Sequence, residues 1–176
     1  MKSLVEYINE ESILSDIEDT IKIGATTAKN VLYDNACKAI EKFILDNYRL
    51  NYERSLKGGK VTIRKRPNKD GKWVVDCKTT NDVQLMPSAK TLTNNMFVWG
   101  KVRNFYICDN DNITSLKGCP EEVENFSIMR VHNLKSFEGM PKVTRYFNFG
   151  FNGIKTKVAE LKKISGSPDV TIWDKN

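Results

Sequence analysis

Three consecutive segments of the chain align with one another, and this alignment decides the fold. They are VRNFYICDNDNITSLKGCPEE (residues 102–122), VENFSIMRVHNLKSFEGMPK (123–142) and VTRYFNFGFNGIKT (143–156), offset by 21 and then 20 residues. The sets of residues that correspond are Val102, Val123 and Val143; Phe105, Phe126 and Tyr146; and Ile113, Leu134 and Ile154. A period in the twenties is typical of a solenoid whose unit is one strand plus a return. A single unit cannot bury its apolar face, so we expect neighbouring units to stack.

The first unit also fits the leucine-rich template LxxLxLxxN, in which the asparagine satisfies backbone groups at the turn leaving the strand. The residues that match it are Val102, Phe105, Ile107 and Asn110. The second unit has Val131 at the asparagine position, and the third has Asn148 where the template is apolar. Either the third unit slips in register by one residue, or it acts as a cap.

The pattern weakens upstream of the first unit. Met96 to Trp99 has the character of one more strand, and Val83, Leu85 and Leu92 are consistent with a decayed turn of the same kind. Downstream, Val158, Leu161 and Ile164 have helical spacing and are followed by an apolar run over 170–173. We expect this last part to be the cap that hides the final apolar layer of an open solenoid.

Helical spacing dominates the N-terminal third of the chain. Apolar residues recur at three- and four-residue steps over 3–23 and again over 27–50, and Gly24 separates the two stretches. Residues 60–65 and 73–77 then alternate apolar and polar side chains around a turn-forming PNKDG, which predicts a hairpin. The overall prediction is an α+β fold, in which N-terminal helices and a β-hairpin lead into a short leucine-rich-like β-solenoid with a C-terminal cap.

These patterns also give a predicted organisation along the chain. Its parts are a possible cleavable targeting segment (1–10), a helical segment (11–53), a basic hairpin and linker (54–95), the leucine-rich-like repeats (96–155) and the C-terminal cap (156–176).

Net charge is +6 and is unevenly distributed. Residues 1–50 carry 6 basic and 9 acidic side chains, residues 51–100 carry 10 and 4, and residues 101–176 carry 12 and 9. The basic excess therefore lies in the predicted hairpin, where it can attract an acidic surface. No apolar run approaches 18 residues, so we expect no membrane span. Acidic residues interrupt the apolar residues of the first 12 positions, unlike a secretory signal, so we expect no export by that route.

The repeat sequence resembles a known family. The unit ending in NITSLKGCPEEV (112–123), followed by a strand of the type NFSI (125–128), is similar to the SLEGxP-type leucine-rich-like repeat proteins of tailed phages. The resemblance covers roughly residues 72–176. It implies the architecture and says almost nothing about the ligand.

The first ten residues, MKSLVEYINE, resemble a capsid-targeting sequence of internal head proteins in T-even-like phages. Those sequences begin Met-Lys, place an acid and an aromatic before Ile, and end in an Ile/Leu-x-Glu site for the prohead protease. The residues that match are Met1, Lys2, Glu6, Tyr7, Ile8 and Glu10, so the resemblance implies a processing site at Ile8 and Glu10. It also implies that the mature protein travels in the virion interior or acts in the host cytoplasm. The alternative is that residues 3–21 are simply an amphipathic first helix.

No enzymatic chemistry is predicted, and neither a cofactor nor a metal. The single histidine, His132, falls in a predicted turn, where it has no evident nucleophile to activate. Asp109 to Asn112 offers calcium-friendly oxygens but lacks the glycine and the distant glutamate of an EF-hand loop. The four cysteines form no CxxC pair, so we expect reduced and mostly buried thiols.

Two surfaces remain as candidate binding sites. Strand alternation leaves a set of side chains on the face opposite the core, where they would bind a host or phage protein; these are Tyr106, Cys108, Ser127, Met129 and Phe147. Alternatively, the N-terminal helices cover that face and make these residues core. The second candidate is nucleic-acid binding through phosphate contacts by the basic hairpin residues Arg64, Lys65, Arg66, Lys69 and Lys72. Protein recognition is the first hypothesis and nucleic-acid binding is the alternative; the oligomeric state is left open.

Overall fold

The computed structural model describes the backbone of residues 4–52 and 61–173, and within them the side chains of residues 25–50, 61–77 and 82–173. The chain divides into two compact units, Met1–Ala39 and Ile40–Asn176. The described part of the first unit, residues 4–39, belongs to helix α1 (Leu4–Asn47), and the second unit contains the end of that helix and the sheet.

Helix α1 is continuous over 44 residues, so the predicted interruption at Gly24 is wrong. A glycine inside a helix costs about 1 kcal/mol relative to alanine, which is too little to end a long helix by itself. The predicted extension to Leu50 is also wrong, because strand β1 (Tyr48–Tyr52) begins directly after Asn47. Tyr48 is buried there, and its ring packs edge-on against Trp99 with centroids 5.2 Å apart.

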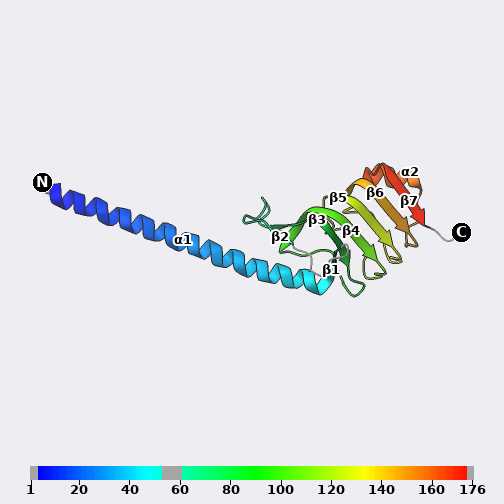
Figure 1. Cartoon of the computed structure of the whole chain (residues 1–176), viewed down its shortest axis with the longest axis horizontal. Helices are drawn as coiled ribbons and strands as arrows, with labels where there is room; N and C mark the ends of the chain where they lie inside the picture. Colours follow the sequence, from blue (N-terminus) through cyan, green and yellow to red (C-terminus); the bar gives the residue numbers. More distant parts are fainter. Residues whose placement is uncertain (1–3, 53–60, 174–176) are drawn as a thin grey trace. The chain divides into compact units, whose positions relative to one another are not determined.

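A seven-stranded sheet forms the second unit (Figure 1). The strands after β1 are β2 (Thr62–Ile63), β3 (Trp73–Leu85), β4 (Phe97–Cys108), β5 (Glu122–Met129), β6 (Lys142–Gly150) and β7 (Asp169–Trp173). Strands β3 to β7 are parallel and adjacent in chain order. Strands β1 and β2 pair antiparallel with β3. The pairing of β2 with β3 confirms the predicted hairpin, and the parallel run with its intervening returns confirms the predicted β-solenoid.

The solenoid begins earlier than its clear repeats. Val83 and Leu85 pair with Phe105 and Ile107 of the next strand, and Leu92 is buried in the following return. The weak turn predicted upstream is therefore a complete turn of the solenoid. Met96 to Trp99 is not a separate turn, because β4 runs without interruption from Phe97 to Cys108.

Strand β6 settles the register of the third unit. Val143 pairs with Val123, but Phe147, and not Tyr146, pairs with Phe126, because the ladder shifts by one residue between these pairs. The third unit therefore slips by one residue, which was one of the two predicted explanations. Past the strand, Asn152 takes the asparagine position: its Nδ2 donates to the Ile128 carbonyl at 2.9 Å, and its Oδ1 accepts the Val131 N–H.

Glycine is required in two of the returns. Gly118 and Gly139 have φ values of +97° and +86°, in the left-handed region that favours glycine. A Cβ at either position would lie 2.4–2.5 Å from the carbonyl oxygen of Leu92 or Leu116 in the preceding return. These glycines let one coil pack directly on the backbone of the coil before it.

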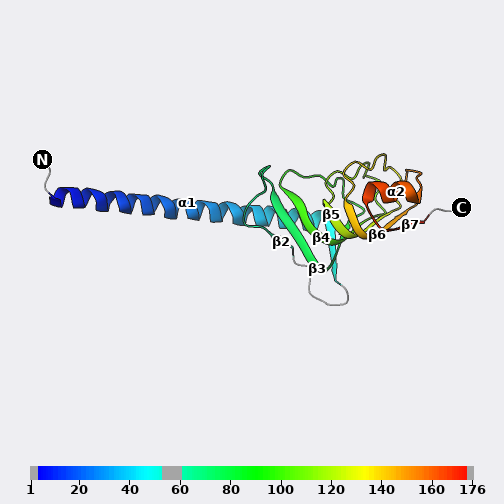
Figure 2. The ribbon, with the colours of Figure 1, turned by 90° about the horizontal axis from the view of Figure 1, so that it is seen from above.

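Each end of the solenoid has its own covering element. At the first end the last turns of α1 contribute the buried Ile40 and Ile44, and Phe43 packs edge-on against Phe97. At the other end helix α2 (Val158–Ser165) lies beside β6 and β7 in both views (Figure 2) and inserts the buried Leu161. The predicted C-terminal helix and strand are confirmed. In the described part of the chain, no helix has the length and apolar content to span a bilayer.

Candidate functional site

The candidate site is the face of the sheet opposite the solenoid core. We define the open face as the residues at the outward-facing positions of the three central strands, which pair with one another row by row. It comprises Asn104, Tyr106 and Cys108 on β4, Asn125, Ser127 and Met129 on β5, and Tyr146, Asn148 and Gly150 on β6. All nine residues are uncharged. The core-facing residues that alternate with them, such as Phe105 and Ile128, are fully buried.

Most of the predicted binding residues lie on this face. Tyr106, Cys108 and Met129 are half-buried there, whereas Ser127 is only 5 % exposed between larger neighbours. The prediction for Phe147 is wrong. The one-residue shift in β6 turns its ring into the core, against Phe126 and Phe149. The same shift places Tyr146 on the open face, where it is 47 % exposed and lies under the Arg145 guanidinium.

A chain of amide hydrogen bonds crosses the open face, and sequence reasoning did not find it. Asn104 Nδ2 donates to Asp82 Oδ1, and Asn125 Nδ2 donates to Asn104 Oδ1, both at 2.6 Å. Asn125 Oδ1 is shielded from solvent and accepts no hydrogen bond from any described residue. The available signal was that Asn104 and Asn125 occupy the same position in the two aligned units. Asn104 is fixed from both sides, because its Nδ2 donates and its Oδ1 accepts, whereas Asn125 is fixed through its Nδ2 alone.

Paired charges line the open face at the upstream ends of the strands. Glu124 accepts a hydrogen bond from Arg103 at 3.3 Å and lies 3.9 Å from Arg145, and Lys142 is 2.8 Å from Glu122. Hydrogen bonding and the charge of Lys142 lower the pKa of Glu122. We call these five residues the upstream rim. Cation, anion and cation follow one another across successive strands, so each carboxylate is neutralised by its neighbours.

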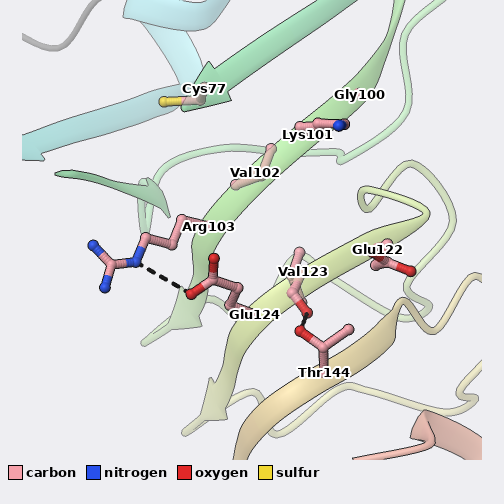
Figure 3. A pocket seen from close by; sticks show the side chains of 9 residues that line it. All are labelled: Cys77, Gly100, Lys101, Val102, Arg103, Glu122, Val123, Glu124 and Thr144. Carbon is pink, nitrogen blue, oxygen red and sulfur yellow. Dashed lines mark hydrogen bonds and ion pairs between the residues drawn. The ribbon is translucent and has the colours of Figure 1, made fainter. Parts of the chain in front are cut away.

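The upstream rim borders a groove of about 460 Å³ (Figure 3). Figure 3 shows Arg103 and Glu124 joined on one side of it, with Cys77 of β3 at the other side. Val102 and Val123 form its apolar part, and Thr144 donates to the Val123 carbonyl at 3.3 Å. The groove crosses strands β3 to β6, and its described lining is partly apolar and partly polar.

A second line of paired charges follows the downstream ends of the strands. Arg130 donates through Nε and Nη2 to the two carboxylate oxygens of Asp109, and this contact lowers the pKa of Asp109. Asp111 accepts the backbone N–H of His132 at 2.9 Å, which lowers the pKa of Asp111. His132 lies in an exposed turn, where its Nδ1 is also 2.9 Å from Asp111. We call these four residues the downstream rim.

The basic residues of the hairpin differ in whether their charged groups have partners in the structure. Arg64 donates two hydrogen bonds of 2.9 Å to the buried carboxylate of Asp76, so its guanidinium is part of the structure and not a free phosphate ligand. Lys72 reaches the Asn94 carbonyl at 3.4 Å. The other three, Lys65, Arg66 and Lys69, are exposed, and no described carboxylate forms an ion pair with them.

The cysteines are thiols, with no disulfide among them. Burial raises the pKa of the Cys108 thiol on the open face. Cys119 is partly covered as a residue, but its thiol is enclosed by protein, and burial raises its pKa strongly. Neither thiol is activated as a nucleophile. Among the residues that the structure describes, no group of three His, Cys, Asp or Glu side chains is arranged to hold a metal ion.

The matching residues of the proposed targeting segment fall at the start of the chain. Ile8 and Glu10 lie in the backbone of α1, and their side chains are outside the described set, as are Met1 and Lys2 altogether. The processing site therefore stays a prediction.

The fold and the site define a class of protein. The second unit is a β-solenoid of roughly five turns within an α+β chain, with an uncharged sheet face between two rims of paired charges. Comparisons of the chain with protein-family models, curated proteins and solved structures found no match.

Proposed function

We propose that this chain is a non-enzymatic protein-recognition module, and that the open face is its binding surface. The observation that carries the proposal is the charge pattern across β4, β5 and β6. Nine uncharged residues, including two tyrosines and a methionine, lie between two rims whose charges are already paired with one another. Protein-binding surfaces have this composition, with aromatic residues and methionine at a centre depleted of charge and polar residues around it.

The rigidity of the face supports the same proposal. The ladder of Asp82, Asn104 and Asn125 holds its amides in place. The buried Phe105 and Phe126 support the strands from the other side. A surface that is already ordered loses little side-chain entropy on binding, and so keeps more of the contact energy as affinity.

Nucleic-acid binding through the basic hairpin is the second candidate. Its support is the exposed group of Lys65, Arg66 and Lys69, which lie within five residues of one another. Phosphate binding needs cations that are free to replace counterions. Arg64 is committed to Asp76, and the rim arginines are committed to carboxylates, so the cationic surface that these described residues leave available is small.

For the biological setting we propose a phage accessory or internal head protein that acts on a host factor. The support is the resemblance of residues 72–176 to phage repeat proteins and of residues 1–10 to a capsid-targeting sequence. Mass spectrometry of virions should then find a form that begins at Glu11. Virions that contain no form of the protein would contradict the internal-head proposal.

The test of the binding surface compares three immobilised full-length baits against host lysate. They are the wild type, an open-face variant (Tyr106→Ser with Met129→Ser) and a hairpin variant (Lys65→Gln, Arg66→Gln and Lys69→Gln). Each is run with and without nuclease, at low and high salt. We expect the wild type and the hairpin variant to retain the same nuclease-resistant protein, and the open-face variant to lose it.

The salt series distinguishes the two candidates, because phosphate contacts weaken steeply with salt and an uncharged protein interface does not. Retention that disappears with nuclease, with high salt and with the hairpin variant would reject the open face and favour nucleic-acid binding. Each variant serves as the other's control, since both change exposed or half-buried side chains of the same unit.

A further inference from the structure

The last strand of the sheet leaves one edge without a partner among the described residues. Strand β7 pairs with β6 on one side and ends the strand order (Figure 1). The Trp173 carbonyl accepts the N–H of Phe151 in the return that follows β6, so it points toward β6. Backbone groups alternate in direction along a strand. The N–H and C=O groups of Val170 and Ile172 therefore point to the free edge.

Nothing within β7 prevents this edge from pairing. Soluble proteins protect edge strands with lysine, proline, bulges or a covering segment. The sequence of β7, Asp169-Val-Thr-Ile-Trp173, contains no lysine and no proline, and its pairing with β6 has no bulge. Three of its five residues are β-branched, which favours strand pairing. By contrast β1, at the other end of the sheet, carries the exposed charge of Arg49 at its second residue.

Exposed apolar side chains also gather in this last coil. Trp173 is 53 % exposed, and Val158 and Ile164 of α2 are about 40 % exposed. Over β3 to β5, in contrast, no large apolar side chain that the structure describes is exposed to this degree. Apolar exposure at an unpaired edge marks a contact surface.

We propose that the free edge of β7 binds β7 of a second copy of this chain, antiparallel, about a two-fold axis at Thr171. In this register Val170 of each copy lies opposite Ile172 of the other. Each such pair exchanges two backbone hydrogen bonds, and one pair lies on each side of the axis. Residues opposite each other in an antiparallel pair point to the same face. The core-facing Val170 and Ile172 of the two copies therefore lie on the same face of the joined sheet and connect the two apolar cores. The open faces of the two copies lie together on the opposite face.

The charges of the edge fit this register. Asp169 is the one charged residue within β7, and it faces Trp173 of the second copy, so no like charges meet. Thr171 faces Thr171 on the exposed side of the sheet, a cross-strand pair that is stabilising. Pairing of identical edges closes the assembly at two copies. Head-to-tail addition would instead require the β1 edge, where Arg49 lies.

The test uses opposite charges at the two-fold axis. Thr171 is exposed, so Thr171→Lys and Thr171→Glu should both fold, but each sets two like charges directly opposite each other in the dimer. Sedimentation velocity of the full chain should give twice the 20.2 kDa of one chain for the wild type. Each single variant should weaken the dimer at least ~10-fold, and an equimolar mixture of the two should restore it. Thr114→Lys and Thr114→Glu, at an exposed threonine in the return after β4, are the matched controls and should leave it unchanged.

Three results would overturn the proposal: a monomeric wild type at high micromolar concentration, single variants that dimerise as the wild type does, or a mixture that does not recover the dimer. Assemblies larger than two copies would overturn it as well. A readout on the unmodified chain is independent of variant folding. Hydrogen exchange at the Val170 and Ile172 amides should slow as the concentration crosses the dimerisation range, while exchange at Phe105 should not change.

Discussion

The ring of Phe147 stacks on the ring of Phe126, with centroids 5.5 Å apart and an interplanar angle of 18°. This contact exists because β6 carries one extra residue between Val143 and Tyr146 relative to β5. Phenylalanine rings thus continue the core from Phe105 through Phe126 to Phe147, with the first pair tilted and the second stacked, while the neighbouring Tyr146 is turned outward.

Replacing Phe147 tests this register. Phe147→Ala should lower the free energy of unfolding by about 3–5 kcal/mol, because it opens a cavity in a fully buried layer. Tyr146→Ala, one residue away and half-exposed, should cost less than about 1 kcal/mol. Urea unfolding followed by tryptophan fluorescence gives both values. Equal losses at the two positions would contradict the shifted register.

The buried carboxylate of Asp76 is the second test. It accepts both Arg64 hydrogen bonds and the N–H of Lys101 at 2.7 Å. Asp76→Ala should cost about 2–4 kcal/mol, because it leaves the Lys101 N–H and the Arg64 guanidinium without their acceptor. The control is Asp46→Ala, which removes an exposed ion pair to Lys42 and should cost no more than about 0.5 kcal/mol. Thermal melts of the two variants should differ clearly, and similar melts would show that the Asp76 contacts contribute little.

The returns can be tested with two glycines of similar backbone conformation. Gly139 and Gly71 have φ values of +86° and +75°. An alanine Cβ would lie 2.5 Å from the Leu116 carbonyl at the first position and would meet nothing within 4 Å at the second. Gly71→Ala should therefore cost only the left-handed strain, about 1–2 kcal/mol. Gly139→Ala should cost more, because the two coils must also move apart. Equal costs would mean that coil spacing adapts freely.

The rims make a prediction about pH. Ion pairing and hydrogen bonding lower the pKa values of Asp109 and Glu122 below their ordinary values of 3.8 and 4.5. A carboxyl whose pKa is lower in the folded state stabilises the fold above its unfolded pKa, and this contribution disappears as pH falls through the lowered pKa. The stability difference between the wild type and Arg130→Gln should therefore be constant from pH 7 to about 5 and shrink below pH 4. Melts across this range measure it, and a difference that grows at low pH would contradict the assignment.

Much of the architecture could be predicted from the sequence, because the same apolar positions recur in successive units of the solenoid. Val102, Phe105 and Ile113 each recur one unit later, so strand, return and core face could be read from the spacing. The predicted α+β solenoid, its hairpin and its terminal helix are all present in the structure.

Three features were not predictable from spacing alone, for separate physical reasons. The break at Gly24 was overestimated, because a single glycine reduces helix stability without deciding where a helix ends. Strand β1 was missed, because Tyr48 continues the apolar spacing of the helix while its backbone already pairs with Leu85. Phe147 was assigned to the wrong face, because a one-residue bulge inverts the side of every residue after it.

The candidate site was predicted in part. Tyr106, Cys108 and Met129 follow from strand alternation and lie on the open face, and Ser127 lies there but is buried. The pairing of rim charges could not be foreseen, since it depends on which side chains of adjacent strands face each other. The same holds for Arg64, whose partner Asp76 lies across the hairpin.

The side-chain bonds of the rims and of the amide ladder join residues about one unit apart in the chain. Arg103 to Glu124, Asn104 to Asn125 and Asp109 to Arg130 are each 21 positions apart. Among the side chains that the structure describes, no contact of this kind joins one end of the solenoid to the other. In evolution such a chain can therefore gain or lose a whole unit while every remaining neighbour is kept. A substitution of one partner in such a bond, however, selects for a compensating substitution of the other partner, one unit away. Substitutions in relatives of this protein should therefore covary at positions one unit apart.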